Sequence, residues 1–254
     1  MITRSFDAVT PAKLAPPTGE GAPRVDACIC TFSQKICDDV LRAYPCERIG
    51  WSRAACGDVP VYRFAHGGRT FAFFLSYIGA PACVAMLEDT RAAFQTETYV
   101  LFGGAGCLDR EIARGKVMVP TAAWRDEGTS YHYAPAADEI ALPGAPTVAA
   151  FCEEMGLPYA LGKTWTTDAI FRETEANIDA RKAAGCICVE MECAAVQALC
   201  AYRAWRLYAF FTSGDLLDAP KWDARLAAGQ VEHSQHDPGH FAIALALAHY
   251  ACEH

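Results

Sequence analysis

Apolar and polar positions along this chain fall into short blocks that predict a succession of strands and helices. Apolar runs typical of buried strands occupy residues 25–30, 71–78, 97–104, 115–124, 185–190 and 206–212. Stretches with helical spacing lie between and after them, at residues 81–95, 147–155, 172–184, 191–204 and 239–251. Strands that alternate with helices predict an α/β fold, in which a parallel or mixed sheet is covered on both faces.

The organisation of the chain follows from the same pattern. Residues 1–24 are rich in Pro, Ala and Gly and have no strand or helix period, so we predict an extended N-terminal arm. After the first strand, Thr31 or Ser33 can cap a helix. Because no linker or repeat divides the remainder, residues 25–254 are predicted to form one domain.

Three predicted strand ends carry residues suited to chemistry, and sheets of this kind bind ligands beyond the carboxyl ends of their strands. Residues 190–192 read Glu-Met-Glu where a strand turns into a helix. Acids there commonly cap the helix through its dipole, and a carboxylate held there can also accept hydrogen bonds from two sugar hydroxyls. Asp215 ends another apolar strand, where it either caps a turn or acts as a general acid whose pKa is raised by burial. Glycines at 103, 104 and 106 predict either a tight turn or a backbone that approaches an anion closely.

Composition and charge narrow the range of functions. Hydrophobic residues make up 52% and charged residues 20% of the 254 residues, which is typical of a globular protein. A net charge of −8 argues against nucleic acid as a partner, because phosphate binding needs a basic face. No apolar run is long enough to span a membrane. We therefore expect a small-molecule substrate.

Cysteine and histidine usage predicts a reducing compartment and no metal. Thirteen cysteines, an odd number, in a chain without an apolar signal core favour free thiols and a cytoplasmic location. There is no CxxC pair for a structural zinc. His233, His236 and His240 lie in a segment interrupted by Pro238 and Gly239, so a polar loop is favoured over a metal site.

Five segments, in this order, carry a family resemblance: YIGAPACVAMLEDT, FGGAGCLDREIARGKVMVP, WTTDAIFRET, VEMECAA and SGD. With them the chain, from about residue 26 to 217, resembles the superfamily of purine nucleoside phosphorylases, uridine phosphorylases and methylthioadenosine nucleosidases. The resemblance implies a three-layer α/β/α sandwich around a twisted, mixed central sheet. It also implies a homo-oligomer (dimer, trimer or hexamer) that binds a nucleoside and uses no cofactor apart from inorganic phosphate as co-substrate.

The resemblance also implies roles around the sugar. Glu192 matches the glutamate that holds the ribose hydroxyls, Met191 the methionine against the sugar, and Glu190 its acidic neighbour. His132 lies in a segment similar to one near the family's sugar site.

Two residues match positions near the base, and a third, in the same segment as Trp165, matches a structural one. Asp215 corresponds to the aspartate that protonates a purine leaving group. Trp165 falls where purine enzymes keep an aromatic ring against the base, and a core tryptophan is the alternative. Asp168 matches an aspartate that we interpret as structural.

The chain differs from the family in the elements that bind phosphate. Residues 31–35 replace a Gly-Asp-Pro loop, Leu101 stands in place of an arginine, and Gly104 in place of a serine or threonine. Without the guanidinium, phosphate loses its best bidentate partner.

Other groups can still hold an anion. The candidates for phosphate binding are Ser33, Lys35, Gly104 and Gly106, together with the backbone N–H groups where the first helix begins. Arg53 is a further candidate, reaching across a subunit interface as an arginine does in related oligomers.

Three functions follow. The first is a nucleoside phosphorylase that cleaves a purine nucleoside to free base and sugar 1-phosphate. Purine is favoured because Asp215 can protonate its leaving nitrogen and because residues 172–177 do not reproduce the Gln and Arg pair with which uridine phosphorylases bind uracil. The second is a nucleosidase that uses water, although no acid follows the first strand before Asp38. The third is a nucleoside-binding protein without turnover.

Overall fold

The computed structural model describes residues 1–55, 57–112, 115–218 and 238–254. In these ranges the strands are β1 (Ala27–Thr31), β2 (Glu47–Ser52), β3 (Val59–His66), β4 (Arg69–Leu75), β5 (Thr98–Cys107), β6 (Val117–Asp126), β7 (Glu139–Ala141), β8 (Tyr159–Thr167), β9 (Cys186–Glu190) and β10 (Arg206–Leu216). The α-helices are α1 (Gln34–Ala43), α2 (Ala80–Asp89), α3 (Ser130–Tyr133), α4 (Ala145–Glu154), α5 (Glu175–Ala183), α6 (Cys193–Arg203) and α7 (Pro238–Ala251). Short 3-10 helices are η1 (Ile2–Arg4), η2 (Thr90–Ala92) and η3 (Ile170–Arg172).

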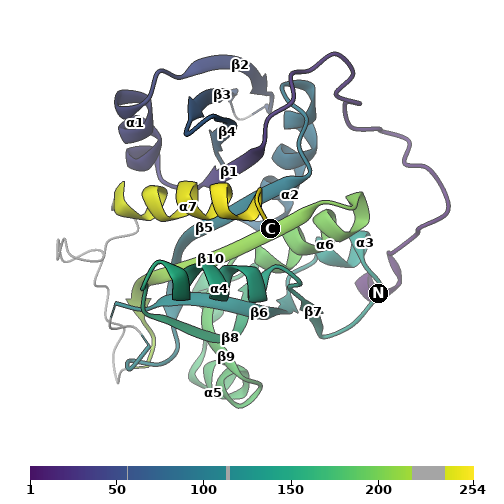
Figure 1. The fold of residues 1–254 in the computed structure, drawn as a ribbon. Helices are drawn as coiled ribbons and strands as arrows, with labels where there is room; N and C mark the ends of the chain where they lie inside the picture. Colours follow the sequence, from purple (N-terminus) through teal and green to yellow (C-terminus); the bar gives the residue numbers. More distant parts are fainter. Residues whose placement is uncertain (56, 113–114, 219–237) are drawn as a thin grey trace.

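The strands form one mixed sheet with β5 at its centre. The strand order is β10-β6-β8-β9-β5-β1-β4-β3-β2, and β7 pairs with β6. Because β5 also pairs in parallel with β10, the strands β5, β10, β6, β8 and β9 close into a ring. The strands β1, β4, β3 and β2 extend from β5 as an open sheet, so the long strand β5 serves both parts (Figure 1).

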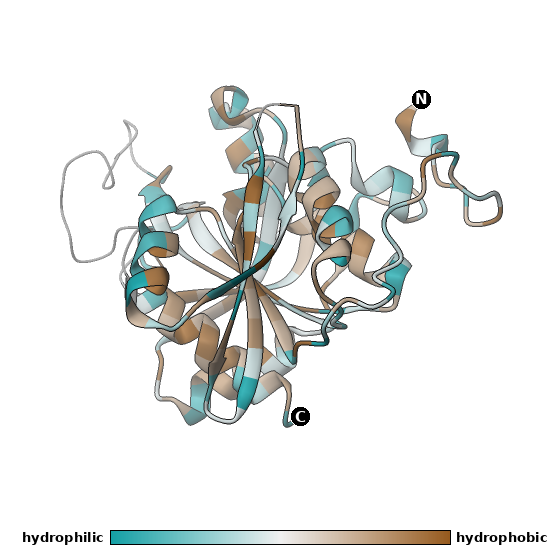
Figure 2. Cartoon of the chain, turned by 90° about the horizontal axis from the view of Figure 1, so that it is seen from above, coloured by the Kyte–Doolittle hydropathy of each residue, from teal (hydrophilic) through white to brown (hydrophobic). Residues whose placement is uncertain are grey.

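Helices cover both faces of this sheet, as the alternation of side chains in β1 requires. Ala27 and Ile29 pack into a cluster with α1, α4 and α7. Cys28 and Cys30 point the other way, into a cluster with α2 and α6. The predicted α/β fold with helices on both sides of a mixed sheet is confirmed, and the ring of strands is a feature that the sequence did not predict (Figures 1 and 2).

The elements with long apolar runs lie where the sequence predicts them. The elements with a mixed apolar and polar pattern were not predicted. The strands β2, β3, β7 and β8 and the short helix α3 were not predicted. β2 is largely exposed, so its sequence has no apolar period to detect. Ser33 is the N-cap of α1, because its side-chain oxygen accepts a hydrogen bond from the backbone N–H of Ile36 at 3.3 Å.

The N-terminal arm runs along the outside of the folded body (Figure 1). Within residues 1–24 the only helical element is η1, and Arg24 forms an isolated bridge with Gln95. Val9 and Leu14 on this arm are 89% and 90% exposed. Among the residues described, no helix is both long and apolar enough to cross a bilayer.

Candidate active site

The Glu-Met-Glu segment joins the end of β9 to the start of α6, and its first acid is fully engaged by protein groups. The Glu190 carboxylate accepts hydrogen bonds from the backbone N–H groups of Glu192 at 2.7 Å and Cys193 at 2.6 Å. It also accepts from the hydroxyls of Thr164 at 3.2 Å and Thr166 at 2.5 Å. Burial raises the pKa of Glu190, and these four hydrogen bonds oppose that rise. Glu190 therefore caps α6 and ties it to β8, which fixes the backbone that carries Glu192.

Glu192 is the N-cap residue of α6 and is 6% exposed. Its Oε1 accepts a hydrogen bond from the backbone N–H of Gly79, in the loop between β4 and α2, at 2.5 Å. Burial, and then the charge of Glu190, raise the pKa of Glu192 to about 8, while backbone N–H groups oppose the rise. Met191 beside it is partly exposed. The structure thus holds one buried, readily protonated carboxyl at this helix start.

Asp215 lies at the carboxyl end of β10 and is partly exposed. It pairs with Gly106 of β5, and Gly106 pairs on its other side with Val189 of β9. Because strands are about 5 Å apart, Asp215 and Val189 are separated by about 10 Å across the sheet. Val189 precedes Glu192 by three residues, so the structure brings the ends of β9 and β10 to the same region.

The glycines at 103, 104 and 106 lie inside β5, which continues to Cys107, and the expected turn after the strand is absent there. Gly106 is required by packing: a Cβ at this position would stand 2.8 Å from Cγ1 of Val189. The same atom would lie 3.3 Å from Oδ1 of Asp215. A side chain at 106 would therefore displace both the neighbouring strand and the candidate acid.

The residues predicted to bind phosphate lie together only in part. Ser33, Gly103 and Gly104 line a cavity of about 20 Å³ with Thr31, Phe32, Ile36 and Phe102. Lys35 is absent from its walls; its Nζ pairs with Asp39 at 2.8 Å and its side chain is 56% exposed. A space of this size holds about one water molecule. In this conformation the cavity is too small for a phosphate ion.

Trp165 is a core residue. It is 1% exposed and packs with Leu108 and Val189, and its indole N–H donates to Oδ2 of Asp126 at 3.0 Å. A ring buried to this extent offers no face to a base, so the arrangement matches the core alternative rather than the stacking one. Asp168, which we interpreted as structural, accepts a hydrogen bond from the backbone N–H of Gly128 at 3.1 Å.

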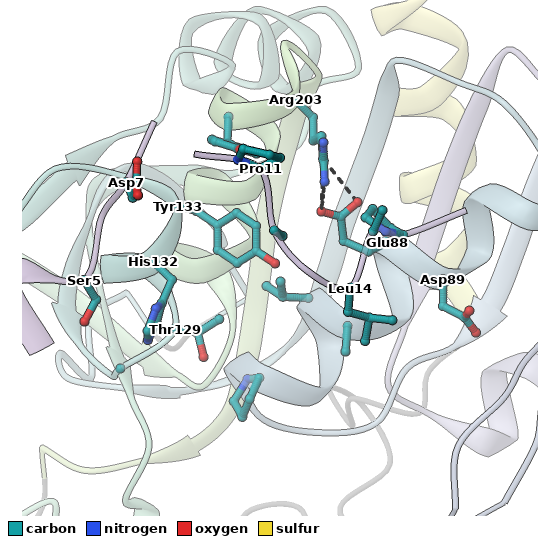
Figure 3. A pocket seen from close by; sticks show the side chains of 18 of the residues that line it. Ser5, Asp7, Pro11, Leu14, Glu88, Asp89, Thr129, His132, Tyr133 and Arg203 are labelled. Atoms are coloured by element: carbon teal, nitrogen blue, oxygen red, sulfur yellow. Dashed lines mark hydrogen bonds and ion pairs between the residues drawn. The ribbon is translucent and has the colours of Figure 1, made fainter. Parts of the chain in front are cut away.

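His132 lies apart from the two carboxyls, on a groove between the N-terminal arm and helices α2, α3 and α6. The groove has a volume of about 930 Å³, and neither Glu192 nor Asp215 lines it. Figure 3 shows His132 and Tyr133 on one wall, with the Glu88–Arg203 ion pair (2.6 Å) on another. The structure does not bring His132 into contact with Glu192.

Of the histidines considered for a metal, His233 and His236 lie outside the described residues. His240 is buried in α7, with its Nδ1 3.4 Å from the Thr212 hydroxyl of β10. Within the described ranges no group of three or more His, Cys, Asp or Glu side chains is arranged to hold a metal ion.

Two contributors near the carboxyls were not predicted from the sequence. One is the backbone N–H of Gly79, which carries no side-chain signature. The other is Glu173, between η3 and α5: burial, and then the charge of Asp215, raise its pKa to about 7. Glu173 falls at the start of the helix predicted at residues 172–184, where acids are common, so only the fold reveals its proximity to Asp215.

Comparison with known proteins gives the following relatives. The family model described as "Phosphorylase superfamily" matches residues 26–243. A guanosine phosphorylase from Halorubrum lacusprofundi is 30% identical over 142 residues, which cover 53% of this chain and 56% of that protein. A uridine phosphorylase from Thermococcus kodakarensis is 32% identical over 98 residues, which cover 37% of this chain and 34% of that protein. The matched region thus spans about half, or about a third, of the length of these curated relatives.

Solved structures share the fold over nearly the whole chain. The crystal structure of uridine phosphorylase from Vibrio fischeri ES114 has a TM-score of 0.74 at 17% identity and covers 96% of this chain and 100% of that one. The crystal structure of AMP nucleosidase from Bacteroides thetaiotaomicron VPI-5482 has a TM-score of 0.67 at 16% identity and covers 91% of this chain and 90% of that one.

Proposed function

Because the chain belongs to the phosphorylase superfamily, we propose that it cleaves the N-glycosidic bond of a purine nucleoside with inorganic phosphate, giving the free base and a sugar 1-phosphate. The observation that carries the proposal is the pairing of β5 with β10 at Asp215 on one side and, on its other side, with β9 at Val189, three residues before Glu192. The two acids would act on different parts of one nucleoside. Names of relatives within the superfamily include both phosphorylases and a nucleosidase.

Glu192 is proposed to hold the sugar. A carboxylate can accept two hydrogen bonds at once from the neighbouring hydroxyls of a ribose. The N–H of Gly79 and the capping of α6 by Glu190 hold it in place. Met191, partly exposed beside it, is proposed to contact the apolar face of the sugar. Glu190 acts in this scheme as a positioning residue, because its oxygens are occupied by protein donors.

Asp215 is proposed to be the general acid. As the C1′–N bond breaks, its electron pair moves onto the base, and a proton delivered to the base nitrogen neutralises that developing charge. The requirement for a proton at the leaving nitrogen supports a purine as the base.

Hydrolysis is the second candidate function, and the cavity near Ser33 favours it. That cavity holds about one water molecule, and the described residues that line it include no Lys or Arg. For phosphorolysis, Ser33, Gly104, Gly106 and the first turn of α1 would have to open to admit the anion, with Lys35 turning away from Asp39.

Base release from inosine, guanosine, adenosine and uridine, measured with and without inorganic phosphate, tests both candidates. Phosphorolysis requires that turnover depend on phosphate and yield a sugar 1-phosphate; turnover that is unchanged in phosphate-free buffer shows hydrolysis. Asp215→Asn is expected to lower kcat by about 10²- to 10⁴-fold. Asp179→Asn, an exposed aspartate on α5, is the matched control. Nucleoside binding without base release by the unaltered chain would indicate a binding protein instead.

We also propose that the chain forms a homo-oligomer. Met1, Val9 and Leu14 expose nearly their whole side chains on the arm that borders the groove of Figure 3, and contact with a second copy would bury them. Light scattering of the whole chain and of a variant with Val9→Ser and Leu14→Ser measures this directly. A monomer at micromolar concentration in both samples would contradict the proposal.

A further inference from the structure

A polar cavity lies at the amino end of β5, away from the two candidate acids. Tyr99, the second residue of β5, is on its wall, whereas Asp215 pairs with Gly106 near the other end of the same strand. The strand rises about 3.3 Å per residue, so Tyr99 and Gly106 are about 23 Å apart. This cavity is therefore separate from the candidate active site.

The size of the cavity limits what it can hold. Its volume is about 150 Å³, against about 20 Å³ for the cavity beside Ser33. Pockets that enclose drug-sized molecules have volumes of about 300–1,000 Å³. The cavity is thus large enough for a small ion and too small for a whole nucleoside.

Arg24, at the end of the N-terminal arm, lies on the wall of this cavity. The backbone of the arm is fixed here, because Arg24 forms a bridge with Gln95 and the N–H of Gln95 donates to the carbonyl of Pro23 at 2.9 Å. In the part of the chain that the structure describes, the guanidinium of Arg24 has no ion pair and no hydrogen bond. Its positive charge and its donors are therefore available to a ligand.

Arg91, in η2, supplies a second guanidinium to the wall. Its Cζ lies 5.8 Å from the ring centre of Trp205, and the rings of Trp205 and Tyr99 are 4.8 Å apart. Its Nη1 approaches Glu88 only to 3.5 Å, whereas Arg203 holds the same carboxylate with its Nη2 at 2.6 Å and its Nε at 3.0 Å. Because Arg203 is the main partner of Glu88, Arg91 can pair with a second anion.

The hydroxyl of Tyr99 is a third donor at this place. The side chain is 2% exposed and lines the cavity. Across the described ranges the hydroxyl has no hydrogen-bond partner. Burial raises the pKa of Tyr99 well above its usual value, so the group is a neutral hydroxyl that can donate. A buried hydroxyl without a partner costs free energy, which a bound acceptor would recover.

We propose that this cavity binds a free oxyanion of the size of phosphate, held by Arg24, Arg91 and the Tyr99 hydroxyl. The planar guanidinium group matches the geometry of an oxyanion and forms charge-assisted hydrogen bonds with it. Glu97 is the acid on the same wall; it is exposed and forms no ion pair with the described residues, and two guanidinium charges outweigh it. The bound ion would join the N-terminal arm to η2 and β5.

Titration calorimetry with inorganic phosphate, at an ionic strength held constant with chloride, tests the site. One phosphate per chain should bind here, and Arg24→Gln and Arg91→Gln should each raise its Kd by about 10- to 100-fold. Arg24→Gln removes no contact within the described residues, so we expect it to fold. Glu97→Gln should lower the Kd, because it removes a repelling charge. Arg206→Gln is the matched control: its Nη2 donates to Thr98 at 2.8 Å and it is not on the wall, so the Kd should change by less than about threefold.

The outcome of this titration is independent of the proposed function. Loss of phosphate affinity in both cavity variants supports the site even in a chain that releases no base from any nucleoside. Phosphate binding that neither Arg24→Gln nor Arg91→Gln weakens would place the ion elsewhere and overturn the proposal. The absence of any phosphate binding by the unaltered chain, or an equal loss of affinity in Arg206→Gln, would overturn it as well.

Discussion

The capping of α6 by Glu190 makes a quantitative prediction about stability. Glu190→Ala removes the acceptor for the buried backbone N–H groups of Glu192 and Cys193. Each unsatisfied buried donor costs about 1–3 kcal/mol, so the free energy of unfolding should fall by about 2–6 kcal/mol. For a chain of this size, about 2–4 °C per kcal/mol converts this to a drop in Tm of about 4–24 °C. The hydroxyls of Thr164 and Thr166 add little, because they can turn to other acceptors.

Glu190→Gln is the matched control for this experiment. Its amide oxygen can still accept the two backbone N–H bonds, and its NH₂ group can donate to the threonine hydroxyls, which accept as well as donate. The expected loss is about 1 kcal/mol or less. Calorimetry or tryptophan fluorescence during heating compares the two variants. Equal Tm values for Glu190→Ala and Glu190→Gln, or a Glu190→Ala variant as stable as the unaltered chain, would refute the capping argument.

Three further predictions concern the site and its frame. Burial raises the pKa of Glu192 to about 8, so the carboxylate form that binds the sugar becomes more abundant as the pH approaches 8. We therefore expect kcat/KM for a nucleoside to rise towards pH 8 and Glu192→Gln to flatten that rise. An identical pH profile for the two chains would contradict a role for this carboxylate in binding the sugar. Burial, and then the facing His66, lower the pKa of His249. The contribution of the neutral imidazole to the free energy of unfolding is therefore fully present above about pH 6.5 and should be lost as the pH falls through the lowered pKa of His249. His249→Phe should reduce this loss of stability, measured by thermal denaturation at several pH values. Gly106→Ala places a Cβ 2.8 Å from a side-chain carbon of β9 and should lower the free energy of unfolding, measured by chemical denaturation, by about 1–3 kcal/mol. Gly128→Ala, whose new Cβ has no atom within 4 Å, should lower it much less.

The fold could be predicted from the sequence wherever one face of an element is buried against a neighbour. The strand at residues 27–31 alternates between two clusters, and all five of its residues are buried, so its apolar run is continuous. The strand β8 was missed because its first half, at residues 159–163, is partly exposed and carries Gly162 and Lys163. Closure of the five-stranded ring was also missed, because strand pairing between β5 and β10 leaves no periodic mark in either sequence.

The acids of the candidate site were identified because they stand where apolar strands end. Their detailed environment depends on backbone groups and on docking that no residue pattern encodes. Gly79 contributes only an N–H, and the pKa of Glu173 is raised by its burial and by the charge of Asp215 from another part of the chain. For Lys35 the sequence offered an alternative that the phosphate prediction did not use. Its position one turn before Asp39 on α1 favours the ion pair on the helix surface that the structure shows.

In the proposed function, the leaving group and the nucleophile would be served by different parts of the sheet, which explains why residues for the first were easier to find in the sequence. Glu192 and Asp215 belong to the ends of β9 and β10, where acids interrupt apolar runs and are conspicuous in the sequence. The nucleophile would enter beside β1 and β5, where Ser33 and Gly104 offer a hydroxyl and backbone groups that many helix starts and packed strands also possess. Stabilising the departing base and holding the sugar impose the same demands whether phosphate or water attacks C1′. The two carboxyls therefore support cleavage of a glycosidic bond equally well for phosphate and for water. Which of the two nucleophiles reacts depends on whether the cavity next to Ser33 opens.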